Sequence, residues 1–335
     1  MSKITIPAGY RMPLTNNELQ RAIELIHQEF QHSLTVRLNL HRVSAPLFVD
    51  GKTGLNDDLN GVERPVTFDI PDVGTDGQVV HSLAKWKRLA LKRYEFKLGT
   101  GLYTDMNAIR RDEVVDNLHS IYVDQWDWEK HIDPQNRNHI YLRETVRDIV
   151  GAICDTSAAL RNAFPVLTFK PDRDVYFITT QELEDRFPDL TPSERETEIC
   201  RKHKTVFLMQ IGGKLRSGKP HDGRAPDYDD WTLNGDILMW NPVLQRSFEV
   251  SSMGIRVDQA ALDRQLTEAG CDERRKLPFH QMLLNGELPQ SIGGGIGQSR
   301  LCMLLLGKAH IGEVQASVWD EQTLQACRDA GVILL

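Results

Sequence analysis

The stretch from about residue 119 to 256 constrains the fold of this chain most. It holds four strand-like segments, at about 119–129, 205–211, 235–241 and 247–256, and their faces are mixed and partly polar. Turns and long loops separate them, and regular crossover helices do not. Parallel neighbours in a sheet need such crossovers and are usually apolar on both faces. The sequence therefore predicts an α+β fold, with a mostly antiparallel sheet flanked by helices and not a doubly wound parallel sheet.

Amphipathic segments on both sides of this stretch supply the helices. The first is predicted over about 16–38, where Thr15 and Glu18 form a T-x-x-E capping box and apolar residues recur every three or four positions. Further helices are predicted over about 84–95, over 139–163 and from Thr191-Pro192 onward.

Composition excludes several classes of protein. The chain has 335 residues and a net charge of -7, which is unfavourable for a general nucleic-acid binder. No apolar run approaches the roughly 18 residues of a membrane span, and the first residues lack the apolar core of a signal peptide. The five cysteines are odd in number and not closely spaced, which argues against disulfides or a zinc ribbon and for a reducing cytoplasm. We expect a cytoplasmic protein with no membrane or nucleic-acid partner.

A glycine run near the C-terminus is the first candidate for chemistry. The string G-G-G-I-G-Q-S-R, from Gly293 to Arg300, is predicted to form a glycine-rich turn that opens a helix. Such a turn exposes backbone N–H groups that suit phosphate. Tight packing of a helix on a sheet explains the glycines about equally well. Arg300 favours the phosphate interpretation, because a cation near a helix N-terminus is unfavourable without an anion.

Charged residues elsewhere suggest further sites. The R-R-D-E turn at Arg110 to Glu113 precedes the strand with Gln125 and Asp127, and an arginine at a strand end can clamp phosphate. Asp236 and Glu249 lie in consecutive strand segments, where adjacent antiparallel strands could bring both carboxylates to one Mg²⁺ ion. The acidic loop from His221 to Trp231 is either a metal or amine site or, more often in such loops, a solvated segment.

Together these pieces resemble a known family. A helix leading to a strand that ends at Pro46, an Arg-x-x-Glu turn before a strand, and a G-x-G-x-x-R segment occur in the order of the three motifs of class II aminoacyl-tRNA synthetases. The closer resemblance is to ammonia-dependent asparagine synthetases of type A. The strings that carry it span nearly the whole chain: V-V-H-S-L-A-K-W-K-R, Y-V-D-Q-W-D-W-E, R-A-P-D-Y-D-D-W, L-N-G-D-I-L, S-S-M-G-I-R-V-D and I-G-G-G-I-G-Q-S-R.

The resemblance implies a fold, an assembly and a reaction. The fold would be a single class II synthetase-like catalytic domain over residues 1–335, with an insertion at about 130–205 between the second and third motif regions. The first motif would form the seam of a homodimer. The reaction would be ATP-dependent conversion of L-aspartate and ammonia to L-asparagine through a β-aspartyl-adenylate, with release of AMP and pyrophosphate. ATP would be a substrate and Mg²⁺ the cofactor.

The same resemblance implies roles for individual residues. Arg110 would hold the α-phosphate, Arg300 the outer phosphates, and Lys87 the side-chain carboxylate of aspartate. Asp57 would face the substrate amine or the incoming ammonium, and Asp236 and Glu249 would carry Mg²⁺. The remaining residues divide into an ATP group, Glu113, Gly294, Gly295 and Gly297, and an amino-acid pocket, Ser82, Gln125, Asp127, Ser251, Ser252 and Arg256.

Three other classes fit the sequence less well. A true aspartyl- or asparaginyl-tRNA synthetase would need an anticodon-binding domain, and the first-motif helix, which begins near residue 16, leaves no room for one. A glutamine-dependent synthetase would need a cysteine nucleophile near the N-terminus, where residue 2 is Ser2. A regulatory paralogue without activity would be expected to lose Arg110, Glu249 or Arg300, and all three are present.

Overall fold

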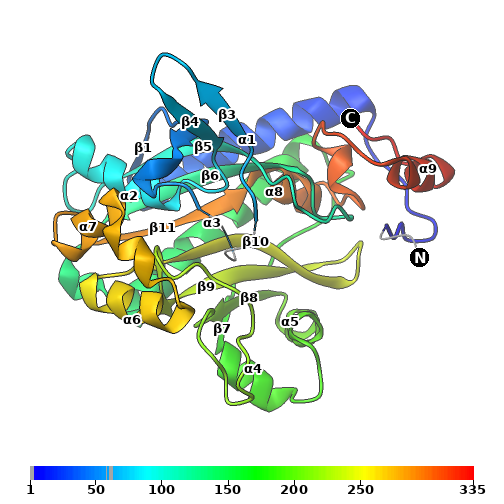
Figure 1. Ribbon diagram of the computed structural model, residues 1–335. Coiled ribbons are helices and arrows are strands. Elements are labelled where there is room, and N and C mark those ends of the chain that lie inside the picture. The colour runs from blue at the N-terminus through cyan, green and yellow to red at the C-terminus, as the bar shows by residue number, and fades with distance from the viewer. Residues whose placement is uncertain (1–3, 58, 60–62) are drawn as a thin grey trace.

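The computed structural model, which describes residues 4–57, 59 and 63–335, is built on one large mixed sheet (Figure 1). Only its outermost pairs, β1 with β5 and β7 with β8, are parallel. The predicted α+β fold with a mostly antiparallel sheet is therefore confirmed. The eight strands lie in the order β1 (Leu40–Arg42), β5 (Gly101–Ile109), β6 (Tyr122–His131), β11 (Ser291–Gly297), β10 (Arg246–Arg256), β9 (Asp229–Asn241), β8 (Thr205–Met209) and β7 (Tyr176–Thr179).

Long apolar helices cover one face of this sheet. They are α1 (Asn16–Leu38), α3 (His139–Ala163) and α8 (Gln298–Leu305). The capping box predicted at Thr15 and Glu18 starts α1. Trp126 and Trp128 of β6 point into this layer and are fully buried. Because side chains alternate along a strand, the polar residues of β6 at odd positions must face the other way.

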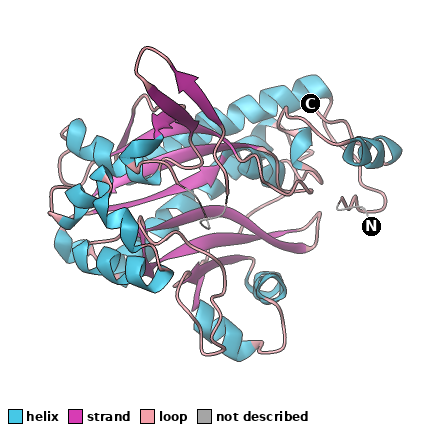
Figure 2. Cartoon of the chain, viewed as in Figure 1, coloured by secondary structure: helices cyan, strands magenta, loops and turns pink. Residues whose placement is uncertain are grey.

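The second face is covered only at its two ends. At one end lie α2 (Ala84–Arg93), α6 (Gln259–Ala269) and α7 (Pro278–Leu284), and at the other lie α4 (Thr180–Arg186) and α5 (Pro192–His203). In Figure 2 the first group lies along the left side of the sheet and the second group lies below it. A small antiparallel sheet of β2 (Phe48–Asp50), β4 (Thr75–Val79) and β3 (Thr67–Ile70) projects beside β5 (Figure 1). The helix α9 (Glu321–Asp329) lies near the C-terminus.

Several boundaries differ from the prediction for local reasons. The strand expected from 119 begins at Tyr122, because the Asp116 carboxylate accepts hydrogen bonds from the backbone N–H groups of Leu118 and His119 and closes a turn there. The strand expected from 235 begins six residues earlier, at Asp229, which pairs in register with Arg256. The segment 130–205, predicted as an insertion, contains α3, β7, α4 and α5.

The prediction of a glycine-rich turn at 293–297 is wrong. These residues are the C-terminal part of β11, which lies between β6 and β10, and α8 follows directly at Gln298. Within the part of the chain described here, no helix is both long enough and apolar enough to cross a membrane.

Candidate active site

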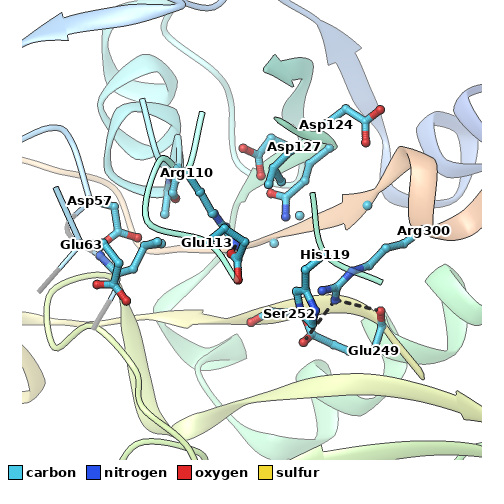
Figure 3. Close-up of a pocket in the computed structure, with 18 of the residues that line it drawn as sticks. Asp57, Glu63, Arg110, Glu113, His119, Asp124, Asp127, Glu249, Ser252 and Arg300 are labelled. Atoms are coloured by element: carbon cyan, nitrogen blue, oxygen red, sulfur yellow. Dashed lines mark hydrogen bonds and ion pairs between the residues drawn. The ribbon is translucent and has the colours of Figure 1, made fainter. Parts of the chain in front are cut away.

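A cavity of about 390 Å³ opens on the uncovered part of the second sheet face (Figure 3). Figure 3 shows Asp57 and Glu63 at one end and Arg300 with Glu249 at the other. Most residues predicted for the site line this cavity. They are Asp57, Ser82, Lys87, Arg110, Glu113, Gln125, Asp127, Glu249, Ser252, Arg256, Gly294, Gly295, Gly297 and Arg300.

Strand β6 and helix α2 supply a buried ion pair to the floor. Gln125 and Asp127 lie at odd positions of β6 and so face the cavity, opposite Trp126. The Lys87 ammonium is 2.7 Å from the Asp127 carboxylate and donates to the backbone carbonyl of Gly294 at 2.8 Å. Burial lowers the pKa of Lys87 while Asp127 counteracts the shift. Lys87 is thus held in place at the wall of the cavity.

The glycines of β11 leave room for these charged side chains. A Cβ on Gly295 would overlap the Gln125 amide and lie 2.8 Å from the Asp127 carboxylate. A Cβ on Gly293 would overlap the Glu129 carboxylate and lie only 2.5 Å from the Arg256 guanidinium. Packing is therefore the reason for the glycines at these two positions, but it is packing against side chains of the neighbouring strands and not of a helix on the sheet.

Arg256 lies between two buried carboxylates. Its guanidinium donates to both oxygens of Glu129, at 2.7–3.1 Å, and to Asp229. The Ser291 hydroxyl donates to the same Glu129 carboxylate at 2.7 Å. Burial raises the pKa of Asp229, and Arg256 opposes that shift. Asp229 and Arg256 line the cavity, whereas Glu129 lies beneath it.

Arginines define the other end of the cavity. Arg300, at the third residue of α8, has a guanidinium nitrogen 3.5 Å from the Glu249 carboxylate. Arg110 lies 4.0 Å from Glu113, and its Nε has no hydrogen-bond partner within the described residues. His119 faces the same space and is oriented by the Asp116 carboxylate at 2.8 Å. Cations on several sides suit a polyphosphate.

Asp236 does not line the cavity, which corrects a detail of the predicted magnesium site. Its carboxylate forms an ion pair with Arg224, which does line the cavity. Burial raises the pKa of Asp236 to about 7, and Glu249 adds to the rise while Arg224 opposes it. Asp236 lies opposite Ser252 in the β9–β10 register, close to Glu249. This oxygen pair fits the donor chemistry of Mg²⁺, which takes further oxygens from phosphate and water.

Two other expectations also change. Ser251 is buried and is absent from the lining of the cavity, which Ser252 of the same strand reaches. The acidic loop from His221 to Trp231 is not a solvated segment. Three of its four aspartates are buried and paired: Asp227 with Lys85, Arg274 and His280, Asp229 with Arg256, and Asp230 with Arg137, whereas Asp222 is exposed. Among the described residues, no group of three or more metal-ligating side chains lies there.

Sequence reasoning missed other residues of the cavity wall. His119 and Asp124 belong to the segment predicted as a strand, and Tyr228 follows the buried Asp227. Asp124 also accepts hydrogen bonds from the backbone N–H and hydroxyl of Ser299 at the start of α8. The available signal was that His119 and Asp124 are polar residues in a segment predicted as a strand.

Comparison with known proteins gives one consistent family. The family model described as aspartate-ammonia ligase matches residues 17–331. An aspartate–ammonia ligase of Clostridium perfringens is 58% identical over 100% of both chains. That of Lactobacillus johnsonii is 58% identical over 99% of both.

Solved structures agree on the fold. The asparaginyl-tRNA synthetase of Pyrococcus horikoshii with asparaginyl-adenylate has a TM-score of 0.65 at 13% identity, covering 91% of this chain and 70% of that one. The Entamoeba histolytica enzyme with the same adenylate has a TM-score of 0.64 at 13% identity, covering 90% and 66%. These likenesses show a class II synthetase-like fold. With the match over nearly its whole length, the chain belongs to the aspartate–ammonia ligase family.

Proposed function

We propose that this protein is an ATP-dependent ligase that converts L-aspartate and ammonia to L-asparagine through a β-aspartyl-adenylate, with release of AMP and pyrophosphate. One observation carries the proposal. A single cavity combines Arg110 and Arg300, suited to phosphates, with Lys87 and Arg256, suited to the carboxylates of a small acidic substrate. The full-length similarity to aspartate–ammonia ligases supports it.

In the first step the β-carboxylate of aspartate attacks the α-phosphorus of ATP, and the bond to pyrophosphate breaks. Negative charge spreads over the phosphate oxygens as this happens, so fixed cations stabilise the transition state. We assign the α-phosphate to Arg110 and the outer phosphates to Arg300. Lys87, Gln125 and Arg256 would hold aspartate, because they line the floor next to β11.

In the second step ammonia attacks the acyl carbon of the adenylate, and AMP leaves with the bonding electrons. Ammonium must lose a proton before it can attack. Asp57 and Glu63 face the end of the cavity away from Arg300 (Figure 3). We assign them to the attraction of ammonium and the acceptance of that proton.

Asp236 and Glu249 would hold Mg²⁺, which would neutralise phosphate charge when bound. Each carboxylate is paired with an arginine in the structure. Both carboxylates are therefore already balanced by positive charge at this place, which supports a role in binding a cation.

The proposed activity is tested by AMP release with aspartate and ATP. Ammonium chloride should support asparagine and AMP formation, and ammonia-free glutamine at the same concentration should support little. Efficient use of glutamine would refute ammonia as the nitrogen source. Stoichiometric ADP and phosphate in place of AMP and pyrophosphate would refute adenylation.

We also propose a two-fold homodimer, a cytoplasmic location and one catalytic domain with an insertion at about 130–205. The short edge strand β1 and the exposed Val36 at the end of α1 support a seam along the first motif, since edge strands are usually covered. The five cysteines are free, as is usual in a reducing compartment.

A further inference from the structure

Arg224 is a largely buried arginine of the cavity wall to which the proposed mechanism gives no task. It lies in the connection between β8 and β9, lines the cavity and forms a largely buried ion pair with Asp236. Its Nε–H is buried with no hydrogen-bond partner in the described structure. An arginine that served only to neutralise Asp236 would be expected to have its remaining donors satisfied.

The arrangement of Arg224 repeats that of Arg300. Each arginine lines the cavity and pairs with one of the two carboxylates expected to hold Mg²⁺: Arg224 with Asp236, and Arg300 with Glu249. The four groups are neighbours, since Glu249 interacts electrostatically with both arginines. If a divalent cation bound the two carboxylates, both arginines would lose these partners and would be free to turn to the polyphosphate.

The backbone on either side of Arg224 is tied down. His221, on the upstream side, is 2.9 Å from Glu196 of α5. Asp227, on the downstream side, is fully buried and bonds to Lys85 and His280 at 3.2 and 2.9 Å. Rotation of the Arg224 side chain therefore needs no opening of the loop.

We propose that Arg224 is a second arginine for the outer phosphates: it neutralises Asp236 in the nucleotide-free enzyme and turns to the β- and γ-phosphates when ATP and Mg²⁺ bind. This inference rests on the proposed function, because it assumes that the cavity binds ATP. It predicts that Arg224 distinguishes a triphosphate from a monophosphate.

The test compares binding of α,β-methylene-ATP and of AMP, both with Mg²⁺, by isothermal titration calorimetry. Arg224→Gln should weaken the triphosphate analogue about tenfold or more, through loss of charge-assisted hydrogen bonds, and AMP less than about twofold. Arg216→Gln is the matched control. Arg216 lies in the same connection but is exposed and pairs with Asp185, outside the cavity. The control should bind both ligands as the unmodified enzyme does.

The outcomes separate the inference from the proposed function. Unchanged triphosphate binding by Arg224→Gln would overturn the inference, and so would equal weakening of AMP, which would indicate a role in folding or at the α-phosphate. If the unmodified enzyme bound neither ligand and released no AMP, the proposed function itself would fail, and the inference with it. Melting temperatures of both variants check that the fold persists.

Discussion

Replacement of Arg300 by alanine should separate catalysis from stability. The Arg300 side chain is about one-fifth exposed, and its ion pair with Glu249 is long, at 3.5 Å, with a carboxylate that is itself 42% exposed. Exposed ion pairs contribute about 0–1 kcal/mol. The arginine also lies in the first turn of α8, where the helix dipole disfavours a cation. Alanine should therefore change the free energy of unfolding by less than about 1 kcal/mol.

The expected effect on turnover is much larger. A guanidinium that holds departing pyrophosphate makes charge-assisted hydrogen bonds of about 1.5–3 kcal/mol each. Loss of one such bond in the transition state corresponds to roughly a ten- to hundredfold lower rate. Removal of Arg300 also leaves the Glu249 carboxylate without its partner beside the phosphates, and the repulsion between these negative charges adds to the loss of rate.

The assay pairs thermal unfolding with AMP release for Arg300→Ala. Arg328→Ala is the control, because Arg328 also forms an exposed ion pair on a helix, with Glu321 of α9, and does not line the cavity. A melting temperature within a few degrees of the unmodified protein, together with a large fall in kcat/KM for ATP, would support the phosphate role. Near-normal activity would refute it, and a loss of activity that merely followed a loss of stability would do the same.

Three further outcomes are expected. Gly295→Ala should raise KM for aspartate and lower the melting temperature, because its Cβ displaces Gln125 and the Asp127 oxygen that pairs with Lys87. Gly294→Ala should also lower the melting temperature, because its Cβ meets the Ser252 backbone at 2.7 Å. His310→Gln should make the free energy of unfolding depend less on pH below 7. Burial lowers the pKa of His310 from 6.5 to about 4, so on acidification the unfolded chain binds the proton before the native protein does. The unmodified protein should therefore lose about 2 kcal/mol of stability between pH 7 and 5 that the variant keeps, which urea unfolding would measure. Light scattering should give the mass of a dimer at micromolar concentration, and a fully active monomer would contradict the proposed seam.

The helices and the class of the sheet could be predicted because their signals are local. The capping box at Thr15 and the apolar repeat through Leu38 specify α1 without reference to the rest of the chain. The alternation along 122–128 separates Trp126 and Trp128 from Gln125 and Asp127, and the structure places these pairs on opposite faces.

Other features depend on contacts that are distant in the sequence. A glycine run can open a helix or let two strands approach over buried side chains. At Gly293 the choice is made by Glu129 and Arg256, which both lie more than thirty residues earlier in the chain. The acidic loop reads as solvated for the same reason, since the cations that pair with the buried Asp227 are Lys85 of α2 and Arg274 just before α7. Asp236 lies in a strand as predicted, but it does not line the cavity, because Arg224 pairs with its carboxylate and covers it.

The glycines of β11 and the buried ion pairs beneath them are one arrangement. Charges removed from water lose several kcal/mol of hydration each, and only close partners offset that loss. Lys87 with Asp127, and Arg256 with Glu129, are such pairs, and they lie directly against β11. Any larger residue at Gly293 or Gly295 would displace one partner and leave the other charge buried alone. A small acidic substrate can then bind cations that are already fixed and desolvated, so less of its binding energy is used to order the site. The glycines of β11 thus leave the room that these charged side chains need in the floor of the cavity.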